Sequence, residues 1–523
     1  MTGGGLLALI AYGSQNVILS GTPQMTYFYK TFRRYTHFAT ENVTTAMDGP
    51  NELPFDKPIE LRAKIQRVGD LLCDLYFTFT IPDIYSKFIS PGSRQYEFKW
   101  VRYLGAAIIQ KAAFFVGGQK IQEFDGTYLL AKAMSDLTTD EFEKWRILIG
   151  DTDELNDPSK GVYAGGPTAS AYPSVFQNPN ININSQANRP SIFGQEIHVP
   201  LSFWFSEAFS NALPLVGLQF HECEVRITLN PIERLYTYLD LAGNRVAPNY
   251  RVSSPPANSY LNIPTYGQNT DLNAPISAFL ADWGVTRPPL DQFYINPRLQ
   301  ATYVYLPTDE QRIFAISPLS YVVTQITPQV FTGLTVRKTL DIEIHNPLTR
   351  LFFLPKRSDS AARNDFSNFT NWSTNPTPPY NPTPTTNDTT NPLYSQALAS
   401  GILASGLIVP NGQISIIRAL RVLCDGNEIQ QEKTADYFTK ITPWKYMKGQ
   451  TKTLFPVYSF SLHSPGVQPS GSINASRIRN FQVEVDVFDL PPNTTYTYDL
   501  TIYVENINFF EVASGMGGVK YAI

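Results

Sequence analysis

The chain is poor in the residues from which catalytic sites and disulfide-linked domains are built. It has three cysteines, five histidines and 16% charged residues in 523 positions. Cys73, Cys223 and Cys424 are too few for a disulfide framework, and each lies in an apolar run. We therefore expect buried free thiols and folding in a reducing compartment. The net charge of −4 shows no basic excess, which argues against direct nucleic-acid binding.

Motifs with a known catalytic mechanism are missing as well. The sequence contains no Gly-x-Ser-x-Gly, no His-Glu-x-x-His, no phosphate-binding Gly-x-x-x-x-Gly-Lys and no Cys-x-x-Cys. The best metal candidate is the segment His221–Glu224, because His221 and Cys223 would share one face of a strand. No second ligand cluster accompanies it, so an ordinary strand is the preferred interpretation. We predict no enzyme activity, no catalytic residue, no cofactor and no metal.

Aromatic residues and prolines are abundant instead. Aromatics make up 13% of the chain and there are 40 prolines. Aromatics favour strands, whereas proline is confined to loops and sheet edges. Residues 71–81 and 481–487 have the composition of strands, and the spacing of Thr138 and Glu141 predicts a capping box before a short helix. The composition predicts an all-β protein with long loops and a few short helices.

Two distant segments have nearly the same pattern. Ile109–Gln122 and Ile417–Gln430 are each an apolar run, a glycine turn at Gly118 or Gly426, and a final Ile-Gln. A repeat with so long a period indicates two similar domains in tandem.

The chain is long enough for two cores of about 200 residues each. Many short strands with large insertions are typical of jelly-roll β-sandwiches. We predict two tandem jelly rolls, a double jelly roll. The expected organisation is an N-terminal arm at 1–25, a first jelly roll at 26–232, a linker or insertion at 233–294, a second jelly roll at 295–512 and a C-terminal tail at 513–523.

The arm contains the apolar run Leu6–Tyr12, which is shorter than the roughly 20 residues that span a bilayer. It is interpreted either as a segment that docks on a neighbouring subunit or membrane surface, or as a buried first element. Glycosylation sequons cluster in the Asn/Thr/Pro/Ser-rich stretch 363–394. The possible glycosylation sites there are Asn368, Asn371 and Asn387, although such a composition also produces sequons by chance.

Several segments, in order along most of the chain, resemble the major capsid proteins of nucleocytoplasmic large DNA viruses. No match falls on 233–294 or 363–394. The matching segments are 4–15, Gly21–Phe28, Phe32–Phe38, Val116–Gln122, Leu213–Glu222, Thr308–Phe314, Tyr458–Leu462 and Gln468–Ile478.

This resemblance implies a double jelly roll that forms homotrimers, each a pseudo-hexagonal capsomer of an icosahedral virion shell. The partners it implies are neighbouring capsomers, minor capsid and penton proteins, and an internal viral membrane reached through the arm. Assembly in the host cytoplasm is expected.

Two other functions suit a β-sandwich rich in tyrosine and tryptophan. One is a glycan-binding lectin or adhesin, which specific binding on a glycan array would support. The other is a carbohydrate-active enzyme with two carboxylates across a cleft, which loss of activity on a single Asp or Glu change would support.

Overall fold

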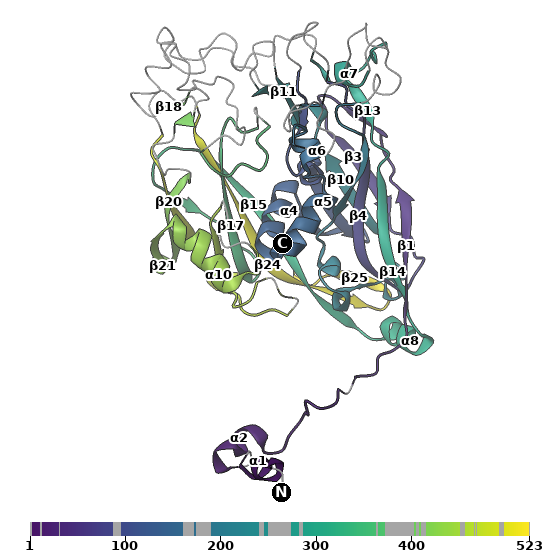
Figure 1. The fold of residues 1–523 in the computed structure, drawn as a ribbon, viewed down its shortest axis with the longest axis vertical. Helices are drawn as coiled ribbons and strands as arrows, with labels where there is room; N and C mark the ends of the chain where they lie inside the picture. The colour runs from purple at the N-terminus through teal and green to yellow at the C-terminus, as the bar shows by residue number, and fades with distance from the viewer. Residues whose placement is uncertain are drawn as a thin grey trace. The chain divides into compact units, whose positions relative to one another are not determined.

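The computed structural model describes most of the chain. The described residues are 3–10, 13–30, 32–86, 96–160, 172–173, 190–239, 245–248, 274–281, 286–361, 364–371, 402–403, 407–408, 415–449, 455–464, 466, 468–490 and 496–521. They are mostly β-strands with short helices, as predicted (Figure 1).

The first jelly roll is built from two antiparallel sheets. Its strands alternate between the core and the outside: Ile59, Leu61 and Ala63 of β3 are buried, and the residues between them are exposed. One sheet has the order β1 (Ala39–Ala46), β14 (Arg298–Tyr305), β4 (Leu71–Ile81) and β8 (Gln195–Pro200), with β9 (Leu213–Pro214) also on β4. The other has the order β3 (Ile59–Lys64), β10 (Cys223–Leu229), β6 (Ile109–Val116) and β7 (Gln119–Phe124).

The second jelly roll repeats this arrangement. One sheet has the order β15 (Leu319–Leu334), β24 (Tyr498–Ala513), β17 (Leu348–Arg357) and β22 (Val457–Ser459), with β25 (Met516–Val519) also on β24. The other has the order β16 (Lys338–Asp341), β23 (Phe481–Val487), β20 (Ile417–Cys424) and β21 (Asn427–Thr434). The eight main strands correspond one to one, from β1 with β15 to β14 with β24, whereas β9 lies on β4 and β25 lies on β24, so these two short strands have no counterpart.

The pairing of β14 corrects one expected boundary. The sequence predicts Arg298–Tyr305 in the second jelly roll, whereas this strand lies between β1 and β4 in the first, with Leu299 opposite Phe77. The stretch 233–294 is therefore not a linker between the two jelly rolls. It is an insertion before the last strand of the first, and its described part adds Tyr236, Tyr238 and Phe279 to the first core.

Smaller elements complete the body. Three additional sheets are β12–β11–β5, β13–β2 and β18–β19; their strands are β2 (Glu52–Pro54), β5 (Lys99–Trp100), β11 (Tyr236–Leu239), β12 (Arg245–Val246), β13 (Gln292–Tyr294), β18 (Ile402–Leu403) and β19 (Leu407–Ile408). The α-helices are α3 (Leu104–Ile108), α4 (Gly126–Asp136), α5 (Thr139–Leu148), α6 (Asp153–Asn156), α7 (Ile276–Phe279), α8 (Thr308–Ile316) and α10 (Thr442–Tyr446).

Single-turn elements are η2 (Trp204–Ser206), η3 (Phe209–Asn211), η4 (Leu215–Gly217), η5 (Ile232–Arg234) and η8 (Ala475–Arg477), and η7 (Tyr437–Ile441) is a π-helical turn that runs into α10. The capping box predicted at Thr138 and Glu141 is confirmed at the start of α5.

Residues Met1–Ala39 form a separate compact unit. It contains α1 (Gly4–Ile10), η1 (Ser14–Asn16) and α2 (Val17–Ser20). Each of its residues whose exposure is described is exposed, so the interpretation of the arm as a buried first element is not supported. None of the helices in the described part of the chain is both long enough and apolar enough to cross a bilayer.

The repeated glycine segments are equivalent hairpin turns. β6 and β7 are joined by Gly117 and Gly118 with φ of 56° and 81°, and β20 and β21 are joined by Asp425 and Gly426 with φ of 48° and 81°. Two positive φ angles in a two-residue loop are the signature of a type I′ turn, which matches the twist of the flanking strands. The duplication inferred from sequence is therefore repeated in backbone conformation.

We expect Gly426→Val to destabilise the protein by about 1 kcal/mol, because a side chain at this positive φ strains the backbone. Open space surrounds the position, so the effect is conformational and not steric. Urea unfolding followed by fluorescence measures it. Gly426→Asn is the matched control, since asparagine tolerates this conformation. Equal unfolding midpoints for the two variants would contradict the prediction.

Candidate functional site: the junction between the two jelly rolls

Helix α4 of the first jelly roll is enclosed on all sides. Asp125 caps it by accepting a hydrogen bond from the Tyr128 backbone N–H at 2.7 Å. Gly126 starts it, and a Cβ there would lie 1.9 Å from the Ala106 carbonyl oxygen, so only glycine allows this approach. No residue of α4 is exposed. One side of the helix packs on its own jelly roll, and the other meets the second.

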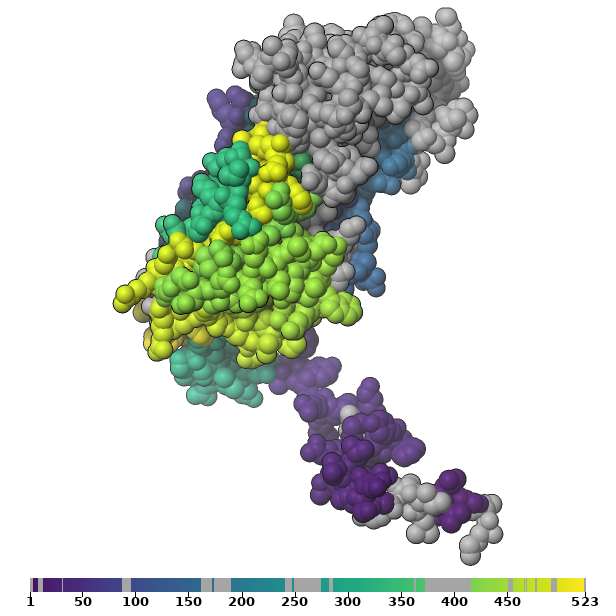
Figure 2. Space-filling model, turned by 90° about the vertical axis from the view of Figure 1, so that its left-hand side faces the viewer, coloured from purple at the N-terminus to yellow at the C-terminus, as the bar shows by residue number. Residues whose placement is uncertain are grey.

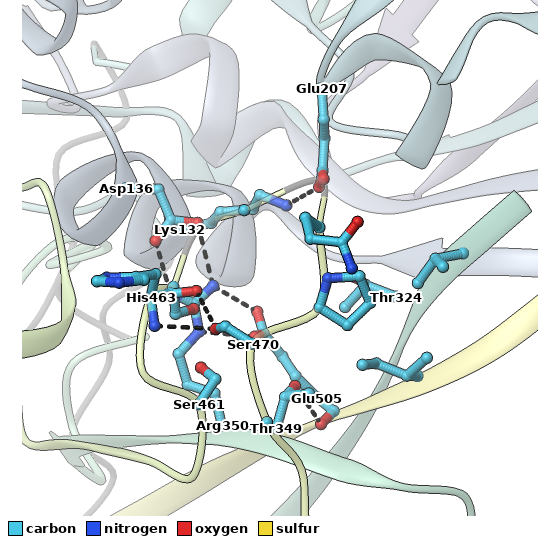
Figure 3. Close-up of a pocket in the computed structure, with 17 residues that line it drawn as sticks. Lys132, Asp136, Glu207, Thr324, Thr349, Arg350, Ser461, His463, Ser470 and Glu505 are labelled. Carbon is cyan, nitrogen blue, oxygen red and sulfur yellow. Dashed lines mark hydrogen bonds and ion pairs between the residues drawn. The ribbon is translucent and has the colours of Figure 1, made fainter. Parts of the chain in front are cut away.

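Arg350 of β17 makes two bidentate ion pairs, one to Asp136 of the first jelly roll and one to Glu505 of its own sheet (Figure 3). Its Nη1 and Nη2 donate to Asp136 at the end of α4, at 2.5 and 3.0 Å. Its Nε and Nη2 donate to Glu505 of β24, at 2.6 and 2.9 Å. The guanidinium also lies 4.4 Å from the Phe352 ring centroid. All three charged residues are buried, so each charge depends on its partners.

Two tyrosine hydroxyls extend the network. Tyr128 of α4 donates to Glu505 at 2.5 Å, and Tyr503 of β24 donates to Asp125 at 2.5 Å. The two rings lie 5.6 Å apart. The helix is thus held near both of its ends by groups of the second jelly roll.

The protonation states follow from this arrangement. Burial favours the neutral form of Glu505, but the Arg350 charge and its hydrogen bonds outweigh it and lower the pKa of this carboxyl group. Burial opposes the charge on Arg350 too, and Asp136 and Glu505 more than offset it, so its pKa is raised. Burial raises the pKa of Tyr128 well above its ordinary value, so its hydroxyl stays a donor.

Contacts on both sides of α4 extend the junction. Gln325 of β15 donates to the Ile121 carbonyl of β7 at 3.0 Å. The Phe220 backbone N–H donates to the Gly515 carbonyl at 2.9 Å. Trp204 packs on Phe510 of β24 with centroids 5.5 Å apart, and both rings are buried. Strand β7, helix α4 and the segment around β9 and η4 therefore all lie against the second jelly roll.

A small cavity of about 60 Å³ lies beside the ion pairs. Lys132 of α4 forms an ion pair with Glu207 at its edge, and His463 and Ser470 line its other side (Figure 3). The charged groups here are paired, and the bonds that cross between the jelly rolls are those of Arg350 with Asp136, Tyr128 with Glu505 and Tyr503 with Asp125. The chemistry of the arrangement is anchoring: it holds two lobes in one relative orientation.

The sequons expected to carry glycans lie elsewhere. Asn368 is buried, and its side-chain oxygen accepts hydrogen bonds from the backbone and hydroxyl of Thr370. Asn371 is buried as well, and its side-chain oxygen accepts from the Tyr496 hydroxyl at 2.9 Å. Burial of both side chains disfavours their glycosylation in the folded protein. Asn387 lies outside the described residues.

The residues of the metal candidate, His221–Glu224, make separate contacts that do not converge on one point. His221 Nδ1 lies 2.9 Å from the Gly517 carbonyl oxygen, Glu222 pairs with Lys64, and Glu224 pairs with Arg226. Only Cys223 points into the core. No group of three or more potential metal ligands occurs in the part of the chain that the structure describes.

The three cysteines are free thiols. Cys73 and Cys223 are buried, as predicted, and burial raises the pKa of Cys73 to about 11 and that of Cys223 to about 12. Cys424 is only half-buried, because it ends β20 next to the hairpin turn.

Sequence reasoning did not find the junction. Asp136 and Arg350 are 214 residues apart, and Arg350 and Glu505 are 155 apart. The one local signal is a charged residue beside an apolar run, as Arg350 precedes Leu351–Leu354 and Glu505 follows Ile502–Val504. That signal marks a buried charge but does not identify its partner.

Each half of the chain matches a model of a known protein family. Residues 26–261 match the family model described as "Major capsid protein N-terminus", and residues 310–518 match "Large eukaryotic DNA virus major capsid protein". The major capsid protein of Phaeocystis pouchetii virus is 24% identical, covering 99% of this chain and 99% of its own length. That of Paramecium bursaria Chlorella virus 1 is also 24% identical, with the same coverage.

Solved structures agree on the fold. The PBCV-1 capsid protein VP54 matches with a TM-score of 0.63 and 20% identity, over 95% of this chain and 100% of its own. The Faustovirus major capsid protein matches with a TM-score of 0.60 and 13% identity, over 96% of this chain and 94% of its own.

The fold is thus a double jelly roll, and the matching family models are those of structural proteins of a virus capsid. The chain belongs to the major capsid protein family of large eukaryotic DNA viruses. Its function is that of a structural capsid protein, which assembles with itself into the shell of the virion. The alternative of a glycan-binding surface protein finds no support in these matches.

Replacing Arg350 by methionine should destabilise the protein by about 3–5 kcal/mol, because Asp136 and Glu505 would remain buried without a counter-charge. Thermal and urea unfolding measure the change. Replacing all three residues together (R350M, D136L and E505L) should recover most of the loss, since no buried charge is left unpaired. Lys64→Met, which breaks an exposed ion pair, should leave the unfolding midpoint nearly unchanged. An equally small effect at Arg350 would contradict the prediction.

Stability should fall on acidification through protonation of Glu505. Its folded-state pKa is lowered, so its ion pair stabilises the protein above the ordinary glutamate pKa of about 4.3 and loses this effect as the pH falls further. Glu505→Gln should lower stability at pH 7 and flatten its pH dependence below about pH 4.5. Unfolding midpoints between pH 3 and pH 7 test this. An unchanged slope in the variant would exclude Glu505 as the source.

Proposed function

We propose that three copies of this chain form a homotrimer that serves as a pseudo-hexagonal capsomer of an icosahedral shell. The observation that carries the proposal is the junction between the two jelly rolls. One chain supplies two lobes of the same strand order, joined by a buried ion pair and by hydrogen bonds. Three such chains supply six lobes, and a six-lobed outline tiles a flat facet.

The contact between copies would be head-to-tail. The first and second jelly rolls meet through different surfaces within the chain, the hairpin and helix of one on the sheet of the other. Repeating such a heterologous contact between chains gives a ring when the rotation closes. Three copies are the number for which two lobes per chain complete a ring of six.

We place minor capsid proteins and an internal membrane among the partners of the arm, and penton proteins among the partners of the assembled chain. Support comes from the exposed apolar side chains of this unit, which include Leu6, Leu7, Ile18 and Leu19. Such residues are unfavourable in water and favour docking on another apolar surface. The proposal includes the domain limits given above, with the first jelly roll extended to Tyr305. It assigns no catalytic role to any residue.

Light scattering on the purified full-length protein tests the trimer. The expected mass is three times the 58.7 kDa of the chain. Negative-stain images of the same sample should show six-lobed particles. A monomer that persists as the protein is concentrated would contradict the proposal, as would a stable dimer.

A further inference from the structure

The second jelly roll has equivalents of the hairpin and helix that form the junction, and in this jelly roll they are exposed to solvent. In the first jelly roll, hairpin β6–β7 leads directly into α4, which has no exposed residue. In the second, hairpin β20–β21 leads directly into the helical segment 435–446, made of η7 and α10. Here Ile441 is 52% exposed and Trp444 is 78% exposed. Figure 2 shows this green region at the surface of the molecule.

The first jelly roll has an equivalent of the sheet face on which α4 and β7 pack, and this face is more exposed. In the second jelly roll that surface is the sheet of β15, β24 and β17, where Gln325 is buried under β7. The corresponding strands in the first are β1, β14 and β4. Strand β1 has no buried residue, in contrast to β15. The chain thus forms one junction internally. It also exposes the two surfaces, hairpin β20–β21 with segment 435–446 and the β1–β14–β4 face, that could form a second one; these are called the open halves below.

The charges at these two open halves are complementary. Leu75 and Phe77 of β4 match Leu351 and Phe353 of β17: all four are buried, and each pair begins three residues after the residue, Leu72 or Leu348, that precedes the irregularity of its strand ladder. Counting from these pairs, Asp74 stands where Arg350 stands in the second jelly roll. It is half-buried and makes no side-chain hydrogen bond or ion pair among the described residues. An acid thus replaces the base of the occupied junction.

The helical segment shows the opposite replacement. Asp136 lies ten residues after the start of α4, and Lys445 lies ten residues after the start of the segment 435–446. Lys445 is exposed, and its Nζ lies 5.0 Å from the Tyr446 ring centroid. Where the occupied junction pairs Asp136 with Arg350, the open halves would therefore pair Lys445 with Asp74, with the signs reversed.

We propose that hairpin β20–β21 and the segment 435–446 of one copy dock on the β1–β14–β4 face of the next copy, with Trp444 buried between them and Lys445 paired with Asp74. The occupant of each open surface is a second copy of this chain. The inference rests on the proposed trimer and identifies the residues that hold it together. Reversed charges also separate the two junctions, because α4 would place Asp136 beside Asp74 if it docked on the wrong sheet.

Charge exchange tests the pair. Lys445→Glu and Asp74→Lys should each raise the trimer dissociation constant roughly tenfold or more, and the double variant K445E/D74K should return it close to the wild-type value. Trp444→Asp should weaken the trimer at least as much, because buried tryptophans dominate such interfaces. Dilution followed by mass photometry of the full-length protein measures the constants. Lys64→Glu is the control, an exposed charge reversal outside both surfaces, and should have no effect.

A photo-crosslinking residue at position 444 maps the contact directly. The expected product joins it to residues 39–46, 71–81 or 298–305 of another copy. Three results would overturn this inference without contradicting the trimer. They are K445E and D74K variants that form trimers as tightly as the wild type, a double variant that does not recover, and crosslinks to the second jelly roll. A wild-type monomer would overturn both. Unfolding midpoints near that of the wild type confirm that each variant is folded.

Discussion

The pairing of Arg350 with Asp136 and Glu505 is the constraint on which the rest of the structure depends. A guanidinium buried between two carboxylates is stable only when all three groups keep their geometry, because each charge left alone would bear the full cost of desolvation. A tilt of one jelly roll against the other would break the bonds between Arg350 and Asp136. The junction therefore fixes the relative orientation of the two lobes, and a shell subunit needs that orientation to be constant.

The two halves of the chain show how a duplicated domain can become two different neighbours. The strand order, the type I′ turns and the helix after the hairpin are the same in both. The outward-facing residues differ: α4 is enclosed, whereas segment 435–446 is open, and Arg350 corresponds to Asp74. Divergence at the surface with a common core lets one fold make two distinct contacts and discriminate between them.

The polar groups of the junction bond to one another. Its charged and hydroxyl groups are engaged with each other across the junction, and its cavity is small. The strongly shifted groups, such as Glu505 and Tyr128, owe their shifts to burial and to ion pairing within this network. Shifted pKa values at this place therefore indicate a structural contact between domains, because structural ion-pair networks shift pKa values as catalytic sites do.

The sequence by itself determined the all-β class, the duplication and the capping box of α5, because these depend on local patterns: alternation along strands, a glycine in a two-residue turn, and a Thr–Glu spacing. It also determined the family, through short segments kept in order. Only the tertiary structure decided that β14 completes the first jelly roll, that Asn368 and Asn371 are buried, and that Arg350 meets Asp136 and Glu505. Those facts depend on contacts between residues more than a hundred positions apart or on packing against the core, and neither is encoded in local pattern.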